Sequence, residues 1–179
     1  MKTFCISDNY WNYFTQWGTR DFFGMKNEFD RIWNIALGLL GRRSHTAFEL
    51  ERKLLRRGFD KKIVCKIVSK CSQLQFIDDK ISGRLYLSEL IRRGYGPHRI
   101  RYELVQKGVG NDLIDELFFE ESVDKNERAM CEKVLAKKIK MVSTKKDSEK
   151  RKALLHRFLL SRGFSRSVVL DLIKKCHPE

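Results

Sequence analysis

Three segments of the chain repeat one pattern around a glycine, at Gly58, Gly108 and Gly163. Apolar residues stand eight, four and three positions before each glycine, with a basic residue directly before it and an apolar residue directly after it. Apolar pairs follow at five and six, and at nine and ten, positions after the glycine. Both sets follow the period of an amphipathic helix. Each segment is therefore predicted to form two helices that meet at the glycine.

The ends of these helices carry recognisable signals. A glycine just past a helix takes the left-handed conformation that ends it, and the basic residue before it complements the negative carboxyl end of the helix dipole. Thr46 and Glu49 have the spacing of a capping box, and Pro97 suits the first position of a helix. Asp60 and Ser165 are predicted to cap the helices that follow two of the glycines.

A further helix is predicted ahead of each pair, around residues 29–40, 81–91 and 130–139. The middle one should begin after Asp78 and Asp79 and end near Gly94, although Ser82 and Gly83 weaken its start. The predicted fold class is all-α, with three tandem three-helix repeats forming an elongated curved body. The expected divisions are an aromatic-rich N-terminal extension at 1–26 and repeats at 27–75, 76–122 and 123–179.

The net charge of the chain is +14, and residues 1–24 contribute none of it. A basic balance of this size is typical of proteins that bind a polyanion such as nucleic acid, although a solvated surface is the simpler alternative. Eleven basic residues form the candidate partner- or DNA-binding clusters, one in each repeat. They are Lys62, Lys66 and Lys70 in the first, Arg92, Arg93, Arg99 and Arg101 in the second, and Lys133, Lys137, Lys138 and Lys140 in the third.

One stretch has the opposite sign. Six acids occur between residues 112 and 124 with no base among them until Lys125: Asp112, Asp115, Glu116, Glu120, Glu121 and Asp124. Such a stretch would repel a DNA backbone but could face a basic patch on a protein. It could equally be a solvated face with acids near the amino end of a helix. The acids favour a protein partner over bare DNA.

The sequence lacks the usual signs of an enzyme or a metalloprotein. The five cysteines are odd in number and have no CxxC spacing, and the four histidines have no HxxxH spacing. We therefore expect no catalytic residues, no cofactor, no metal and no disulfide framework. The apolar neighbours of Cys65 and Cys131 indicate buried, reduced thiols. No apolar run is long enough to span a bilayer and no signal peptide is evident, so a cytoplasmic protein without a membrane partner is expected.

Several motifs, taken in order, resemble the RecX family of regulatory proteins over about residues 27–175. The most recognisable is Gly94-Tyr95-Gly96-Pro97-His98-Arg99-Ile100, followed by Glu103-Leu104 and Lys107-Gly108-Val109. The others are Glu49-Leu50, Lys53-Leu54 and Arg57-Gly58-Phe59, then Ile77-Asp78-Asp79, and finally Arg157-Phe158-Leu159 with Arg162-Gly163-Phe164-Ser165.

The resemblance implies a non-enzymatic, all-helical protein. RecX proteins bind the RecA recombinase and its filament on DNA and restrain RecA activity in recombination and DNA repair, within the SOS response. The expected partners are therefore RecA and the RecA–DNA filament, with DNA as a further direct contact, for a monomeric protein. The alternatives are a sequence-nonspecific DNA-binding protein that acts without RecA, and a structural helical scaffold.

The first 24 residues depart from the family pattern. They hold eight of the 20 aromatic residues in the chain. Three interpretations are open: an extra interaction segment, a packing arm, or an upstream extension with Met25 as the natural start.

Overall fold

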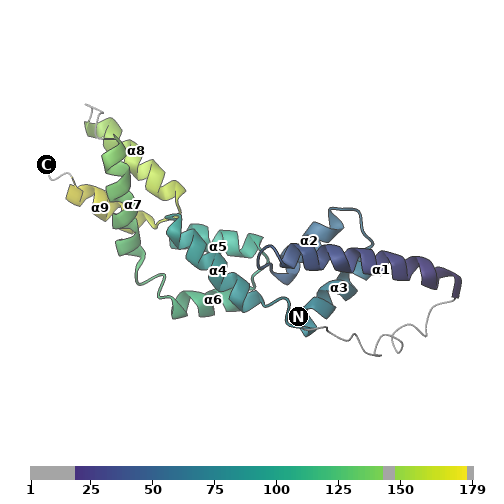
Figure 1. Cartoon of the computed structure of the whole chain (residues 1–179). Helices are drawn as coiled ribbons and strands as arrows, with labels where there is room; N and C mark the ends of the chain where they lie inside the picture. The colour runs from purple at the N-terminus through teal and green to yellow at the C-terminus, as the bar shows by residue number, and fades with distance from the viewer. Residues whose placement is uncertain (1–18, 143–147, 177–179) are drawn as a thin grey trace.

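The computed structural model describes residues 19–142 and 148–176, and these form nine α-helices and no strand (Figure 1). The all-α prediction is therefore confirmed for the described residues. The helices are α1 (Thr19–Leu40), α2 (Ala47–Leu55), α3 (Lys61–Gln73), α4 (Asp79–Arg92), α5 (Pro97–Gln106), α6 (Asn111–Glu120), α7 (Glu127–Val142), α8 (Ser148–Ser161) and α9 (Arg166–Cys176).

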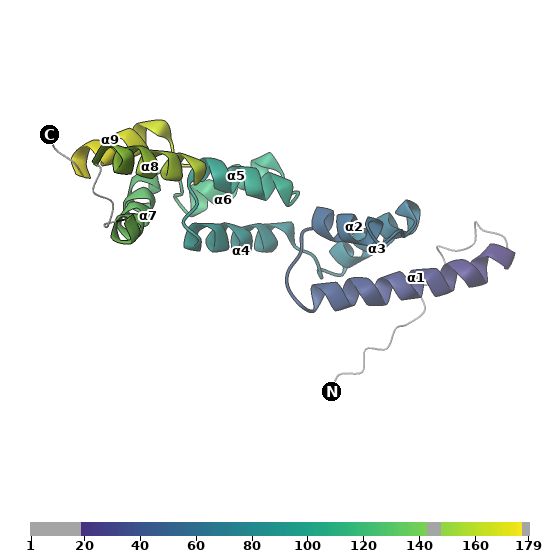
Figure 2. The same ribbon diagram turned by 90° about the horizontal axis from the view of Figure 1, so that it is seen from above.

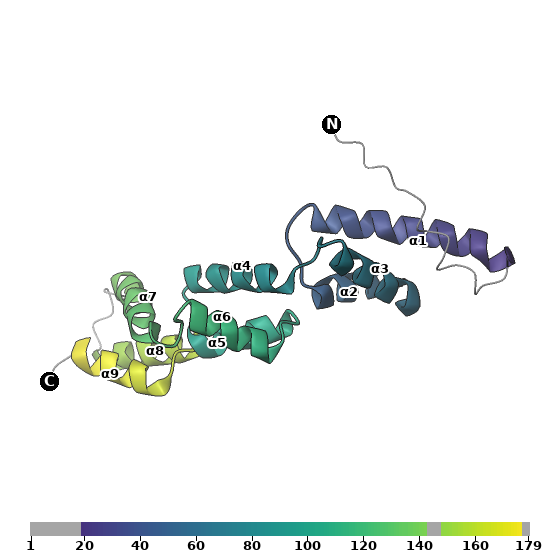
Figure 3. The ribbon, with the colours of Figure 1, turned by 90° about the horizontal axis from the view of Figure 1, so that it is seen from below.

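The helices form three groups of three, arranged in a row so that the molecule is elongated (Figures 2 and 3). Each group has a hydrophobic core of its own, around Leu50 and Leu54 in the first, Ile100 and Leu104 in the second, and Leu155 and Leu159 in the third. These are the apolar positions that precede each glycine in the repeat pattern. Contacts between neighbouring repeats are confined to two junctions, as expected for a repeat array.

The three corner glycines have the predicted conformation. Gly58, Gly108 and Gly163 have φ angles of 82°, 79° and 87°, and Gly94, which follows α4, has a φ of 76°. These angles lie in the left-handed region, where a side chain is disfavoured. Each glycine therefore ends its helix and turns the chain into the next element.

The predicted caps are only partly confirmed. Thr46 accepts a hydrogen bond from the Glu49 backbone N–H at 3.1 Å, and Asp60 caps α3 through the Lys62 N–H at 2.8 Å. The Glu49 side chain does not return to Thr46, however, because it is held by cations and a tyrosine at the first junction. The Ser165 hydroxyl donates to the Glu127 carboxylate at 3.0 Å, which ties the start of α9 to α7.

Ser82 and Gly83 lie within a continuous helix, α4, and both are buried. The Ser82 hydroxyl donates to the backbone oxygen of His45 at 3.1 Å. A Cβ atom added at Gly83 would lie 3.0 Å from the Leu117 side chain. The small residues that seemed to weaken the helix therefore allow α4 to approach repeat 1 and α6 closely.

The helix α1 begins at Thr19, so the division expected after residue 26 falls inside it. Most of the aromatic extension, residues 1–18, lies outside the described residues.

Candidate partner-binding surface

The lysine cluster of repeat 1 lies along α3. Lys62 and Lys66 are exposed and make no ion pair with another described residue. Lys70 is half-buried, and its amine lies 5.1 Å from the ring centre of Trp33 and 5.8 Å from that of Phe29. Two of the three lysines are therefore available to a partner, while the third packs on the aromatic residues of α1.

In repeat 2, Arg92 and Arg93 flank one carboxylate. Their guanidinium groups lie 2.7 and 2.8 Å from Glu89 one turn earlier, with side chains 74% and 58% exposed. The hydrogen bonds from Arg92 and Arg93 lower the pKa of Glu89. Two cations against one anion leave a net positive surface, and exposed pairs of this kind contribute little to stability.

Arg99 and Arg101 occupy different environments. Arg99 lies 2.6 Å from Glu103 and close to Tyr95 and Tyr102. Arg101 instead lies 2.5 Å from Asp115 and 4.6 Å from the ring centre of Phe118, both on α6. Arg101 is therefore held by α6, whereas the other three arginines pair with acids one turn away along the chain.

The acidic stretch is largely matched by cations of its own repeat. Lys80 pairs with Glu116 and Glu120, and Arg84 pairs with Glu120 and Glu121. The sequence showed no base among these acids because their partners lie on other helices, Lys80 and Arg84 on α4 and Arg101 on α5. The α4 and α6 helices thus form a mixed-charge face, and the expectation of an unpaired acidic patch for a basic partner is weakened.

The lysines predicted in repeat 3 lie along α7. Lys133, Lys137 and Lys140 are exposed, whereas Lys138 is half-buried with its amine 4.8 Å from the ring centre of Phe158. This contact starts an alternating row of cations and aromatic rings. The row continues across the second junction, where repeats 2 and 3 meet. The row is Lys138, Phe158, Arg162, Tyr95, Arg99 and Tyr102, with cation-to-ring distances of 4.8 to 5.9 Å.

Arg162 is the one cation of this row that the sequence analysis did not predict as a contact residue. Its guanidinium also donates to the backbone oxygen of Arg93 at 2.9 Å, so it joins repeat 3 to repeat 2. Its signal in the sequence is its place directly before Gly163, which predicts a match to the helix dipole but not a contact with another repeat. The same place in repeat 2 is held by Lys107, which joins repeat 2 to repeat 1.

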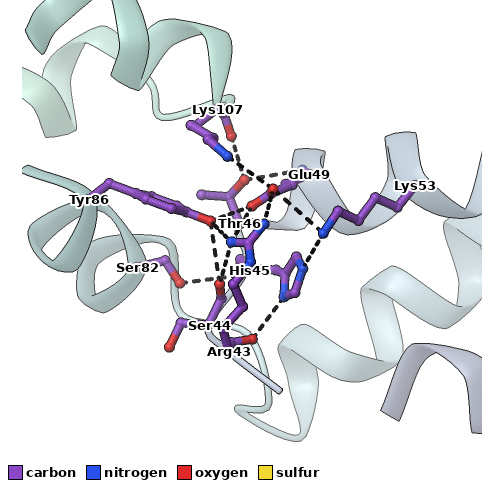
Figure 4. Close-up of polar contacts among 9 residues, drawn as sticks. All are labelled: Arg43, Ser44, His45, Thr46, Glu49, Lys53, Ser82, Tyr86 and Lys107. Atoms are coloured by element: carbon purple, nitrogen blue, oxygen red, sulfur yellow. Dashed lines mark hydrogen bonds and ion pairs between the residues drawn. The ribbon is translucent and has the colours of Figure 1, made fainter. Parts of the chain in front are cut away.

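A polar network centred on Glu49 forms the first junction (Figure 4). The Glu49 carboxylate is 3% exposed and lies 2.5 Å from the Arg43 guanidinium and 3.1 Å from the Lys107 amine. It also accepts a hydrogen bond from the Tyr86 hydroxyl. Arg43 belongs to repeat 1, whereas Tyr86 and Lys107 belong to repeat 2, so one buried carboxylate connects the two repeats.

These contacts shift the pKa values of the network. Burial raises the pKa of Glu49, but hydrogen bonds from Arg43, Tyr86 and Lys107 outweigh it and lower the pKa from 4.5 to about 2. Burial and the hydrogen bond to Glu49 raise the pKa of Tyr86 to about 12. Burial lowers the pKa of His45, whose ring nitrogens lie 2.8 Å from the Arg43 backbone oxygen and 2.7 Å from the Lys53 amine. The network is thus built around an ionised Glu49 and a neutral His45.

The cysteine prediction is half right. Cys131 is buried as expected, but Cys65 is exposed because it faces away from the stripe of Ile63 and Ile67 on α3. Burial raises the pKa of Cys131 to about 12 and that of Cys71 to about 11, so neither thiol is a ready nucleophile.

Within residues 19–142 and 148–176, no three His, Cys, Asp or Glu side chains gather in a way that could hold a metal ion. None of the helices in those ranges is long and apolar enough to cross a membrane.

Comparison with known proteins identifies the repeats. Residues 33–71 match the family model for the first three-helix domain of RecX, and residues 78–117 match that for the second. The chain is 34% identical to "Regulatory protein RecX" of Haemophilus influenzae (strain PittEE) over 82% of its length and 95% of that protein. It is also 34% identical to "Regulatory protein RecX" of Legionella pneumophila (strain Corby), over 81% and 94% of the two chains.

Solved structures support the same fold. The crystal structure of RecX from Lactobacillus salivarius superposes with a TM-score of 0.67 at 22% identity, over 84% of this chain and 96% of that one. A second structure, described as that of regulatory protein RecX, gives a TM-score of 0.71 over 90% and 79% of the two chains. The repeated glycine corners, the three helical cores and the close relatives lead to one conclusion: this chain belongs to the RecX family of regulatory proteins.

Proposed function

We propose that the protein binds RecA and the RecA filament on DNA and restrains RecA activity in recombination and DNA repair. Family membership carries this proposal, since the relatives are named as regulatory proteins. The structure adds an elongated body with exposed cations on all three repeats, which suits a long contact along a charged, repeating partner. The same resemblance supports a monomeric, non-enzymatic regulator that acts in the cytoplasm as part of the SOS response.

The contact surface that we propose includes the second junction and the exposed lysines. Arg92, Arg93 and Arg99 lie near this junction, and Lys62, Lys66, Lys133, Lys137 and Lys140 extend the positive surface along α3 and α7. Lys70, Lys138 and Arg101 contribute charge from positions where an aromatic ring or an acid already holds them. Guanidinium groups bind carboxylates and phosphates alike, so this surface fits a nucleoprotein.

The test measures the DNA-dependent ATPase and strand-exchange activity of RecA with increasing amounts of the protein. Substoichiometric protein should slow both activities. Changing Arg92, Arg93 and Arg99 together to Gln should weaken the effect about tenfold, since each exposed charged contact contributes around half a kcal/mol. No effect of the wild-type protein up to saturation would contradict the proposal.

A matched control removes the same charge elsewhere. Lys80, Arg84 and Arg128 also supply three positive charges, but they lie outside the proposed contact surface and are paired with acids of α6 and α9. Their joint change to Gln should leave inhibition within about twofold of wild type. Equal losses in the two triple variants would show that net charge, and not the second junction, governs binding.

The second candidate function is DNA binding without RecA. The alternating row of cations and aromatic rings favours it, because arginines bind phosphates and exposed rings stack on bases of single-stranded nucleic acid. Tyr102 is 54% exposed and so has room for such stacking. When a protein binds phosphates, the logarithm of its binding constant falls linearly with the logarithm of the salt concentration. Inhibition of RecA that persists at a salt concentration where binding to DNA alone is lost would reject this candidate.

A further inference from the structure

The two junctions between repeats are built on one template. At the first, the Thr46 hydroxyl, at the start of α2, donates to the backbone oxygen of Lys107. At the second, the Gly96 N–H, at the start of α5, donates to the backbone oxygen of Arg162 at 2.8 Å. In both, the oxygen belongs to the residue directly before a corner glycine. The corner of one repeat therefore receives the first turn of the second helix of the repeat before it.

Close approach at both corners depends on the missing side chain. A Cβ atom added at Gly108 would lie 2.2 Å from the Cβ of Phe48, in the first turn of α2. One added at Gly163 would lie 2.4 Å from the Cβ of Arg99, in the first turn of α5. Both distances are well below contact distance, so the helix that docks there packs directly on the glycine.

Repeat 1 has the same corner, and no described residue packs on it. Gly58 has the same left-handed conformation, yet a Cβ atom added there would meet no atom within 4 Å. No described residue donates a hydrogen bond to the backbone oxygen of Arg57, which corresponds to the oxygens of Lys107 and Arg162. The receiving surface that the chain fills twice internally is thus open in repeat 1.

The side chain at this open corner is also unmatched. At the first junction Lys107 pairs with Glu49, which lies in the first turn of the docked helix. Arg57 occupies the place of Lys107, is exposed, and forms no ion pair with any other described residue. The first junction therefore favours a carboxylate in the first turn of a helix that docks on Arg57, although Arg99 holds that place at the second junction.

A second copy of this chain does not supply that turn. The second helix of repeat 3 is α8, which has no following repeat among the described residues on which to dock. It has 14 residues, against 9 in α2 and 10 in α5. It begins about one turn earlier relative to its glycine, so the place of Thr46 is held by Arg151 inside the helix. An arginine there would repel Arg57, and it lacks the hydroxyl with which Thr46 donates at the first junction.

We propose that the Arg57–Gly58 corner is a docking site for the acidic first turn of a helix on the protein partner. A hydroxyl or N–H at the start of that helix would donate to the Arg57 oxygen, and a carboxylate in its first turn would pair with the Arg57 guanidinium. The proposal rests on the proposed function for the choice of partner, the RecA filament, and adds the place and chemistry of one contact.

The experiment measures binding of the full-length protein to RecA filaments on single-stranded DNA by fluorescence anisotropy. Arg57→Glu reverses the unmatched charge, and Gly58→Asn places a side chain in the open space. Asparagine tolerates the left-handed conformation, so the corner should still form. Both changes should weaken binding about tenfold or more. Arg56→Glu is the matched control, with the same charge change at the neighbouring exposed residue, and should change binding less than threefold.

The outcomes separate the two proposals. Binding by the wild-type protein tests the proposed function, and the difference between the variants tests the corner. Wild-type affinity in both Arg57→Glu and Gly58→Asn, with circular dichroism showing folded protein, overturns the docking site. A loss of self-association in Arg57→Glu, seen by sedimentation, also overturns it, since the corner would then join copies of the chain.

Discussion

Replacing Glu49 with Gln tests whether one buried carboxylate holds the first two repeats together. The substitution keeps the shape of the side chain and removes its charge, while Arg43, Tyr86 and Lys107 remain around it. These three groups would then face a neutral amide. The free energy of unfolding should fall, because the cations lose their buried counter-charge.

The pKa of Glu49 sets the size of the loss. A pKa lowered from 4.5 to about 2 corresponds to ~3 kcal/mol in favour of the ionised carboxylate in the folded state. The Glu49 side chain is almost fully buried, but those of Arg43 and Lys107 are 44% and 32% exposed, and solvent screens their side of the interaction. We therefore expect Glu49→Gln to destabilise the protein by about 2 kcal/mol at pH 7.

The same contact predicts the response to acid. Since folding lowers the pKa of Glu49, its contribution is complete above pH 4.5 and is lost as the pH falls towards 2. Folding also lowers the pKa of His45, so the unfolded chain binds a proton below pH 6.5 that the folded chain resists. Stability should therefore begin to fall below pH 6.5 in both proteins. The further loss below pH 4.5 should be about 2 kcal/mol smaller in Glu49→Gln.

Urea unfolding followed by circular dichroism, repeated from pH 7 to pH 3, measures both effects. The control is Glu116→Gln, whose carboxylate is 49% exposed and pairs with Lys80, and which should lose less than about 1 kcal/mol. If Glu49→Gln matches the wild type in stability and in acid response, the carboxylate does not connect the repeats as described.

The remaining predictions concern the corners and the thiols. Gly108→Asn should destabilise by about 2 kcal/mol or more, because its Cβ meets Phe48, whereas Gly58→Asn should change the melting temperature by only a few degrees. Thr46→Val should cost about 2 kcal/mol in urea unfolding, since the hydroxyl both caps α2 and donates to repeat 2; a loss below half of that would contradict this dual role. The Cys131 thiol should resist alkylation at pH 8 until urea unfolds the protein, as followed by mass spectrometry, and prompt modification of the folded chain would refute its burial.

Local patterns were enough to predict the helices and their corners. The glycines at 58, 108 and 163 and the apolar positions around them fix where helices end and which faces are buried, because these depend on neighbours within a few residues. The caps show where this reasoning stops. Thr46 caps α2 as predicted, but Glu49 leaves the capping box because Tyr86 and Lys107 approach it from another repeat.

Charge was the least predictable feature of the candidate surface. Arg92, Arg99 and Arg101 were predicted from the sequence to form one cluster, yet Arg101 pairs with Asp115 on α6. The acidic stretch looked unpaired because Lys80, one of its partners, lies on a different helix. An ion pair requires only that two charges lie close in space, and the sequence does not report the distance between helices.

By itself the sequence determined the all-helical repeat, its period and its likeness to one family, since these follow from spacings along the chain. Only the tertiary structure decided which repeats touch, through which atoms, and which corner stays open. Gly58 and Gly108 have the same conformation and the same local pattern. They differ because a helix from the preceding repeat packs on Gly108, and no described helix precedes repeat 1 to pack on Gly58. That difference is a property of neighbours in space, which no local pattern records.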